Sequence, residues 1–149
     1  MRVRPTLSGS TATSSKQTKT QAPEKDSKGI FARELGQQQD TADRYREEVE
    51  ILRKEIETTG DKLSDEPTLG NFSKFRDALG RLARRISNEA YRLEKFGGTP
   101  ENPRYYEIIN VINHEADRLY RLILQEQRDN LAITAQVIGI KGMVVDLMT

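Results

Sequence analysis

The sequence predicts an all-α protein, a single antiparallel up-and-down bundle of about four helices preceded by a disordered N-terminal tail. From Tyr105 to the C-terminus, apolar residues recur at alternating steps of four and three, which is the repeat of a helical seam. The same repeat occurs in two earlier stretches, and turn-forming residues separate all of them. With 149 residues, the chain has room for one domain and its tails.

The first 29 residues are rich in Ser, Thr, Lys and Gln and contain few large apolar groups. Such a segment cannot bury enough surface to offset the entropy of ordering, so residues 1–29 are predicted to form a disordered basic tail. A nucleic-acid-binding arm is the alternative interpretation. Residues 30–39 are expected to form a short helical flap or linker around Ile30, Phe31 and Leu35, or else a partner-binding motif.

The bundle domain is predicted over residues 40–149. Its first helix covers about residues 40–63, with Asp40 or Thr41 as the N-cap. Gly60 and then the Asp65-Glu66-Pro67 turn are expected to end it. Its inward residues share one register: Tyr45, Val49, Leu52, Ile56 and Leu63.

The second helix is predicted over about residues 69–95, capped by Thr68 or Asn71. Gly80 within it would permit another helix to approach closely. The predicted inward residues are Phe72, Phe75, Leu79, Leu82, Ile86, Ala90 and Leu93.

The third and fourth helices are predicted over about residues 103–126 and 130–147. Gly97 and Gly98 end the preceding helix, and Asn102 is the expected cap of the third, with Pro103 in its first turn. The inward seam of these two helices consists of Tyr105, Ile109, Ile112, Ala116, Leu119, Ile123, Ile133, Val137, Ile140, Val144 and Leu147.

Two interpretations are open for residues 125–130, where Glu126 and Asn130 occupy seam positions. A break capped by Asp129 or Asn130 is favoured, because an unbroken helix of about 65 Å would be too long for its partners to cover. The alternative is a continuous helix with a buried polar layer that fixes register.

Few residues in the chain could form a catalytic or metal-binding site. There is no cysteine, which excludes disulfides and thiolate ligands, and His114 is the single histidine. Only Asp117 among its near carboxylates shares a helix face with it, whereas metal sites need several converging ligands. We therefore expect no catalytic, cofactor or metal site, and a protein that is not an enzyme.

A nucleic-acid-binding role is the alternative function. Its contacts would be Arg81, Arg84, Arg85 and Arg104, together with the basic tail. A net charge of +1 provides no overall field that would attract nucleic acid, and Asp77 and Glu89 can pair with the clustered arginines along the helix. Nucleic acid is therefore the less favoured partner.

The C-terminal stretch is apolar on more than one face, and this favours a protein–protein interaction surface. The candidate surface is made of Gly139, Gly142, Met143, Leu147 and Met148, and the expected partner is an unidentified protein or a second copy of the chain. A second group of residues combines Tyr91, Tyr105, Tyr106 and Tyr120 with Arg104 and Arg118. It is more typical of the edge of a core, and an interaction patch is the alternative.

The chain also resembles a known family. The stretches FSKFRDALGRLARRISNEAYRLE, YYEIINVINHEADRLYRLIL and IGIKGMVVDLM are similar to the bacterial YaaR family, and Asn88 to Tyr91 and Gly142 to Leu147 match best. The resemblance covers residues 40–149 and implies a compact four-helix domain in the bacterial cytoplasm, with no assigned activity. This chain is less basic before its third helix than members of that family. The sequence has no signal-peptide-like start and no run of about 18 apolar residues, so a cytoplasmic protein without membrane contact is expected.

Overall fold

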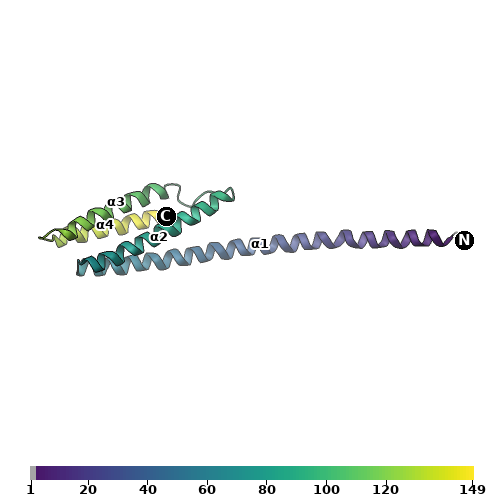
Figure 1. The fold of residues 1–149 in the computed structure, drawn as a ribbon, viewed down its shortest axis with the longest axis horizontal. Coiled ribbons are helices and arrows are strands. Elements are labelled where there is room, and N and C mark those ends of the chain that lie inside the picture. Colours follow the sequence, from purple (N-terminus) through teal and green to yellow (C-terminus); the bar gives the residue numbers. More distant parts are fainter. Residues whose placement is uncertain (1–2) are drawn as a thin grey trace. The chain divides into compact units, whose positions relative to one another are not determined.

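The computed structural model describes the backbone of residues 3–149 and the side chains of residues 29–149. The regular structure in this part of the chain is entirely helical, which confirms the predicted class. The elements are α1 (Val3–Asp65), α2 (Leu69–Lys95), α3 (Tyr105–Leu124) and α4 (Asn130–Met148) (Figure 1). The chain divides into two compact units, Met1–Arg44 and Tyr45–Thr149.

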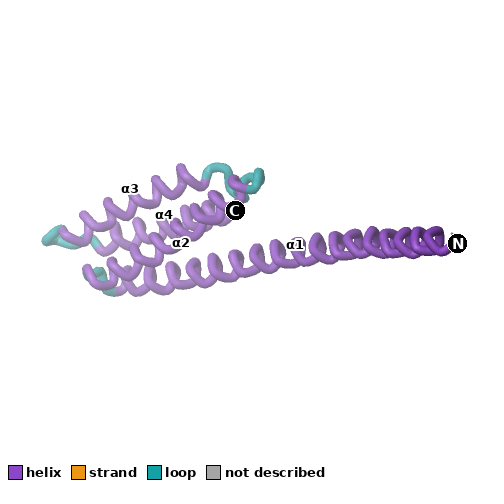
Figure 2. The backbone as a smooth tube through the Cα atoms, turned by 45° about the vertical axis from the view of Figure 1, so that its right-hand side comes forward, coloured by secondary structure: helices purple, strands orange, loops and turns teal. Residues whose placement is uncertain are grey.

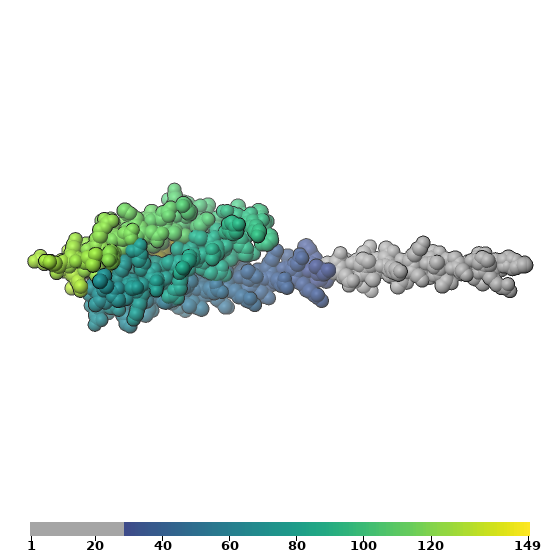
Figure 3. Space-filling view, in the orientation of Figure 1, coloured from purple at the N-terminus to yellow at the C-terminus, as the bar shows by residue number. Residues whose placement is uncertain are grey.

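The second unit is an antiparallel up-and-down bundle of four helices, as predicted. It contains the part of α1 after Arg44, followed by α2, α3 and α4, and the chain reverses at each of three short connections (Figures 1 and 2). Side chains of neighbouring helices fill the spaces between the ribbons (Figure 3).

One apolar stripe from each helix forms the core of this unit. Every predicted inward residue from Ile109 to Leu147 is buried, and Tyr105 packs against the edge of the cluster. The two polar seam positions, Glu126 and Asn130, lie at the connection between α3 and α4 and not in the core. The fully buried side chains include Phe75, Ile56, Leu63, Leu82, Leu119, Ile123, Ile133, Ile140, Val137 and Val144.

The connection between α3 and α4 is a break, as favoured. Gln125 adopts extended φ and ψ angles of −65° and 139°, which end α3. The Asp129 side chain then accepts a hydrogen bond of 3.1 Å from the backbone N–H of Ala132 and caps α4. The alternative of a continuous helix with a polar layer is wrong.

The ends of α2 agree with the sequence prediction. Thr68 caps its start, because its hydroxyl accepts a 3.1 Å hydrogen bond from the backbone N–H of Asn71. At its end Gly97 has a φ of 80°, a region that favours glycine. The N–H groups of Gly97 and Gly98 donate to the carbonyls of Glu94 and Leu93, which is the Schellman arrangement.

The prediction for Asn102 needs a correction. Helix α3 begins at Tyr105, two residues later than expected, and its N-cap Arg104 makes no capping hydrogen bond through its side chain. The Asn102 Oδ1 still accepts a 2.9 Å hydrogen bond from the backbone N–H of Arg104, just before the helix. The side-chain nitrogen of Asn102 donates to the carbonyls of Asp146 and Leu147 at 2.9 and 3.3 Å. Asn102 therefore satisfies the free carbonyls at the C-terminus of α4.

Gly60 does not end α1, as the sequence had suggested, but lies inside the helix. A Cβ atom there would be 2.6 Å from Lys141 Cε, 3.0 Å from Phe75 Cε1 and 3.2 Å from Val137 Cγ1. Gly60 is therefore a point where α1 closely approaches α2 and α4. Gly80, the predicted close-approach residue, has no atom within 4 Å of such a Cβ.

The first unit, Met1–Arg44, differs from the prediction at its boundary with the bundle. Asp40 and Thr41 do not cap a new helix, because α1 is already helical through the expected linker. Three consecutive glutamines favour helix here and no proline interrupts it. Thr41 donates its hydroxyl to the Gln37 carbonyl at 2.8 Å. The predicted tail, residues 1–29, falls almost wholly outside the described side chains and stays a prediction.

Candidate protein interaction surface

The most unusual surface of the bundle is the face of α4 opposite the core. Leu131, Ile138 and Val145 are 85%, 62% and 48% exposed, and they follow one another at intervals of seven residues. Ala135 and Gly142 lie between them and are also exposed. These five residues form a stripe along one side of the helix, since two turns return to the same side. We call them the outer stripe.

The outer stripe carries no charge. Lys141 is the only charged residue between Asn130 and Val145, and its side chain turns toward α1, where it is only 14% exposed. Its ammonium lies 2.6 Å from Asp61 Oδ1 and 3.2 Å from Glu57 Oε2. Burial disfavours the charged form, but the hydrogen bonds with Asp61 and Glu57 outweigh it and raise the pKa of Lys141. The solvent-facing side of α4 is left apolar.

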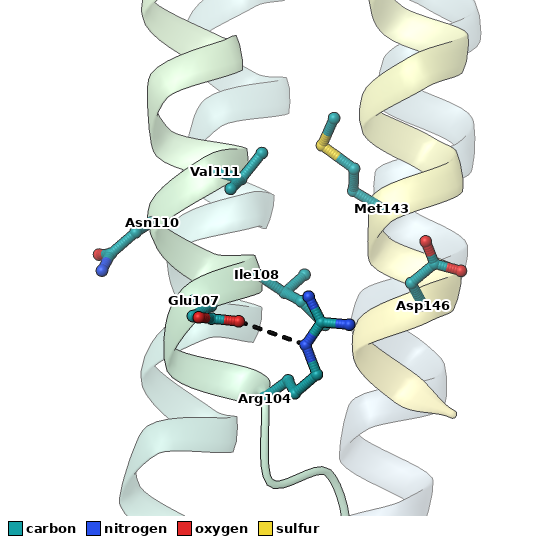
Figure 4. Close-up of a pocket in the computed structure, with 7 residues that line it drawn as sticks. All are labelled: Arg104, Glu107, Ile108, Asn110, Val111, Met143 and Asp146. Carbon is teal, nitrogen blue, oxygen red and sulfur yellow. Dashed lines mark hydrogen bonds and ion pairs between the residues drawn. The ribbon is translucent and has the colours of Figure 1, made fainter.

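A shallow groove of about 440 Å³ lies between α3 and α4. Ile108 and Val111 of α3 and Met143 of α4 point into it, while Asn110 points away (Figure 4). Its lower rim carries Arg104, which pairs with Glu107 at 3.2 Å. The groove therefore extends the apolar surface of α4 onto α3.

The predicted surface residues of α4 are only partly in place. Gly139 and Gly142 are exposed, and a Cβ at either would meet no atom within 4 Å, so the backbone is open to close approach. Met143 and Met148 are partly buried against the core. Leu147 is 3% exposed and belongs to the core, which corrects its assignment to the surface.

Sequence reasoning missed the large residues of the outer stripe. A signal for them existed, because Leu131, Ile138 and Val145 share a seven-residue spacing that is out of phase with the inner seam. The inner seam of the same helix is a second apolar repeat, and the two repeats together leave no polar face that would separate them in the sequence.

The four predicted anion-binding arginines do not form one basic face. Arg81 pairs with Glu55 of α1, and Arg85 pairs with Glu48 of α1. Arg104 comes from the connection before α3 and pairs with Glu107, and Arg84 is exposed on α2. Three of the four charges are thus balanced by a nearby carboxylate.

His114 is exposed on α3, and the carboxylate that shares its face is already engaged. Asp117 Oδ1 accepts a 2.7 Å hydrogen bond from Arg76 of α2. Among the residues with described side chains, no group of three or more His, Asp or Glu side chains is arranged to hold a metal ion.

The tyrosine residues do not gather into one patch. Tyr91 and Tyr106 are exposed, whereas Tyr105 packs against the core. Tyr120 lies 14 residues after Tyr106, about 21 Å along the helix, and its ring centroid is 5.4 Å from that of Phe72. Arg118 pairs within its own helix with Glu115 at 3.4 Å.

Glu89 of α2, which the sequence pattern pairs with the clustered arginines, is a buried carboxylate. It is 6% exposed, with Arg92 Nε at 3.0 Å and Arg85 Nη1 at 3.5 Å. The Arg85 guanidinium also lies over the Tyr45 ring, with its Cζ 5.0 Å from the ring centroid. Burial, together with the negative charges of Glu101 and Glu89, raises the pKa of Tyr45 to about 12, against the opposing effect of Arg85. This cluster joins α1 to α2, and its Glu89 carboxylate is paired with both Arg85 and Arg92.

Within the part of the chain that the structure describes, α4 is the one helix long and apolar enough to cross a membrane. It passes this test although Lys141 and Asp146 interrupt its apolar residues. A mostly buried core helix of a soluble protein can have the same length and composition, but only 28% of this stretch of α4 is buried in the bundle.

The fold thus defines a small helical-bundle protein with one uncharged apolar face. Residues 6–148 match the family described as a protein of unknown function, DUF327, and the chain belongs to that family. The fold is similar to the crystal structure of an uncharacterized protein from Bacillus halodurans, with a TM-score of 0.64 and 20% identity. That match covers 79% of this chain and 97% of the other. No curated protein matches the chain.

Proposed function

We propose that this chain is a non-enzymatic protein–protein interaction module of the bacterial cytoplasm, related to the YaaR family, that binds its partner through the outer stripe. The observation that carries the proposal is the exposure of Leu131, Ile138 and Val145 on a face without charge. Large exposed apolar patches of this kind are typical of interaction sites.

The energetics favour a partner on this face. Fully burying one Leu, Ile or Val side chain contributes roughly 1.5–3 kcal/mol, so three of them supply a substantial gross term for association. The bundle does not need them, because α4 already contributes Ile133, Val137 and Ile140 to the core.

The charge distribution favours a protein partner over nucleic acid. Phosphate recognition needs cations that are free to replace counterions. In the bundle, however, Arg76, Arg81 and Arg85 each bridge to a carboxylate on a neighbouring helix.

Photo-crosslinking in bacterial cells tests the proposal. A benzophenone amino acid in place of Ile138 is expected to give protein adducts of discrete mass, whereas the same probe in place of exposed Lys74 on α2 is not. A Val145→Glu substitution on the same stripe should abolish the adducts from position 138. Equal adducts from positions 138 and 74, or none from either, would contradict the proposal.

A further inference from the structure

We propose that the protein on the outer stripe is a second copy of this chain, packed with its α4 antiparallel and related by a two-fold axis at Ile138. This inference rests on the proposed function, because it names the partner of the same surface. It is supported by the order of residue sizes along the stripe and by the charges at its two ends.

The outer stripe is its own complement when it is reversed. From the N-terminus it reads large, small, large, small, large: Leu131, Ala135, Ile138, Gly142, Val145. A two-fold axis at Ile138 places Leu131 against Val145 of the second copy and Ile138 against itself. Ala135 then falls within one position of Gly142 of the second copy. This reversed match of sizes suits an isologous dimer interface, in which residue i of one copy contacts residue j of the other and the reverse.

The small residues allow the two helices to approach closely. Ala135 has the smallest side chain after glycine, and a Cβ at Gly142 would have no atom within 4 Å. Small residues at a helix crossing bring backbones together and increase the packing of the large residues on either side. The neighbouring Gly139 leaves the edge facing the α3–α4 groove open in the same way.

The charges at the ends of α4 select the antiparallel orientation. Asp146 is exposed at the C-terminal end of the stripe, and α4 begins at Asn130. In the antiparallel pair, Asp146 lies beside the N-terminus of the second α4. The partial positive charge of that helix end and the neighbouring Arg128 favour a carboxylate there, and the capping carboxylate of Asp129 opposes it. In a parallel pair the two Asp146 carboxylates would instead face each other and repel.

Cysteine crosslinking tests this arrangement directly, because the chain has no cysteine of its own. Under mild oxidation, full-length Ile138→Cys is expected to form a disulfide-linked dimer, since the two sulfurs meet on the axis. Leu131→Cys alone and Val145→Cys alone should stay monomeric on a denaturing gel. Their 1:1 mixture should form the linked dimer. Lys74→Cys on α2 is the matched control and should give none.

The expected pattern follows from distance. In the antiparallel pair, residue 131 of one copy lies about 21 Å along the axis from residue 131 of the other, at about 1.5 Å per residue. A disulfide requires Cα atoms within about 7 Å of each other. If all three single variants crosslink equally, the helices are parallel and the proposed orientation is wrong.

Light scattering after size-exclusion chromatography provides an independent readout. The unmodified chain is expected to be a dimer that dissociates on dilution, and Ile138→Glu should weaken it by at least about 100-fold, because two charges would be buried face to face. Lys74→Glu should leave the dimer intact. Unchanged circular dichroism of Ile138→Glu would show that the bundle still folds.

The remaining outcomes separate this inference from the proposed function. A monomer at every concentration, without a crosslink at position 138, overturns the second copy. If photo-adducts with another protein persist in that case, the proposed function stands and only the identity of the partner is wrong. If the monomer floats with phosphatidylglycerol–phosphatidylethanolamine vesicles and Ile138→Glu does not, the occupant is a lipid surface and both proposals fail.

Discussion

Helices α2 and α4 bury comparable stripes in the same core, yet their outward faces differ. The outward face of α2 is charged, and Arg76, Arg81 and Arg85 reach across to carboxylates on α3 and α1. The outward face of α4 presents Leu131 and Ile138 to solvent and has no charge until Asp146. The ordinary requirement of a soluble bundle, one apolar and one polar face, is met by α2 and not by α4.

This difference shows that core packing does not explain the composition of α4. A helix that only completes a bundle needs its inner seam and a solvated exterior, and α2 has both along its 27 residues. The additional apolar residues of α4 lower solubility without adding to the core. The association that we propose is one requirement that such an exposed apolar face would serve.

The largest expected effect comes from truncating the two faces of α4 separately. Ile140→Ala on the inner face should lower the free energy of unfolding by about 2–5 kcal/mol, because it leaves a cavity in the core. Ile138→Ala on the outer face should change it by no more than about 0.5 kcal/mol at concentrations where the chain is monomeric. Urea unfolding of both variants measures the difference. Equal losses would show that both faces serve the fold.

The next effect concerns the close approach at Gly60. Gly60→Leu should lower the free energy of unfolding by about 1–3 kcal/mol, because the added atoms overlap Phe75 and Val137 and displace Lys141 from its carboxylates. The control Gly80→Ala, on α2, has open space and should instead raise it by about 0.5–1 kcal/mol through helix propensity. Thermal and urea unfolding report both changes. A tolerated leucine at position 60 would show that α1 packs more loosely than the structure indicates.

The two glycines also show what the sequence could and could not predict. Apolar periodicity identified the four helices and most of their inward residues, because each stripe must be buried by its neighbours. Leu93, predicted to point inward, is not part of the core. Gly60 and Gly80 look alike in the sequence, and only the packed helices reveal that one meets α2 and α4 while the other faces open space. Periodicity records which face is apolar but not how closely two backbones approach.

The sequence predicted which helix carries the candidate surface but not which of its residues are exposed. The excess of apolar residues after Ile138 pointed to α4, yet Leu147 belongs to the core and Leu131 to the surface. Assigning a residue to the inner or outer stripe requires the rotation of the helix in the bundle, which neighbouring helices set. The predicted start of the bundle helix at Asp40 is wrong for a different reason. Asp40 and Thr41 are typical cap residues, but the backbone before them is already helical.

A smaller effect distinguishes how α2 and α4 end. Helix α2 ends in the Schellman arrangement, whose hydrogen bonds are local in the sequence. The last carbonyls of α4 instead accept hydrogen bonds from Asn102, in the distant connection before α3. Asn102→Ala should therefore lower the free energy of unfolding by about 1 kcal/mol and increase hydrogen exchange in the last turn of α4. Asn88→Ala, at an exposed position of α2, is the control. Unchanged exchange near Leu147 would show that this cap does not hold the helix end.

The smallest effect tests the cluster of Tyr45, Arg85 and Glu89, which joins α1 to α2, through the alkaline titration of Tyr45. Tyr45 lies beside Arg85, and burial with the charges of Glu101 and Glu89 raises its pKa to about 12 in the folded chain, against about 10 for an unperturbed tyrosine. A raised pKa means that the folded state holds the proton more tightly, so this contribution is fully present below pH 10 and is lost between about pH 10 and 12.

Because the Tyr45 ring is only partly buried, solvent screening reduces the expected loss in the free energy of unfolding to about 1 kcal/mol. In Tyr45→Phe, which keeps the ring but cannot ionise, the free energy of unfolding should fall less steeply over this interval than in the unmodified chain. Urea unfolding at pH 9, 10 and 11 gives the two slopes, and absorbance at 295 nm follows the phenolate itself. Because lysines titrate equally in both proteins, they cancel in the comparison. Identical slopes would mean that the cluster of Tyr45, Arg85 and Glu89 does not hold Tyr45 in its neutral form. In that case this contact between α1 and α2 would be as loosely coupled to the fold as the outer stripe of α4.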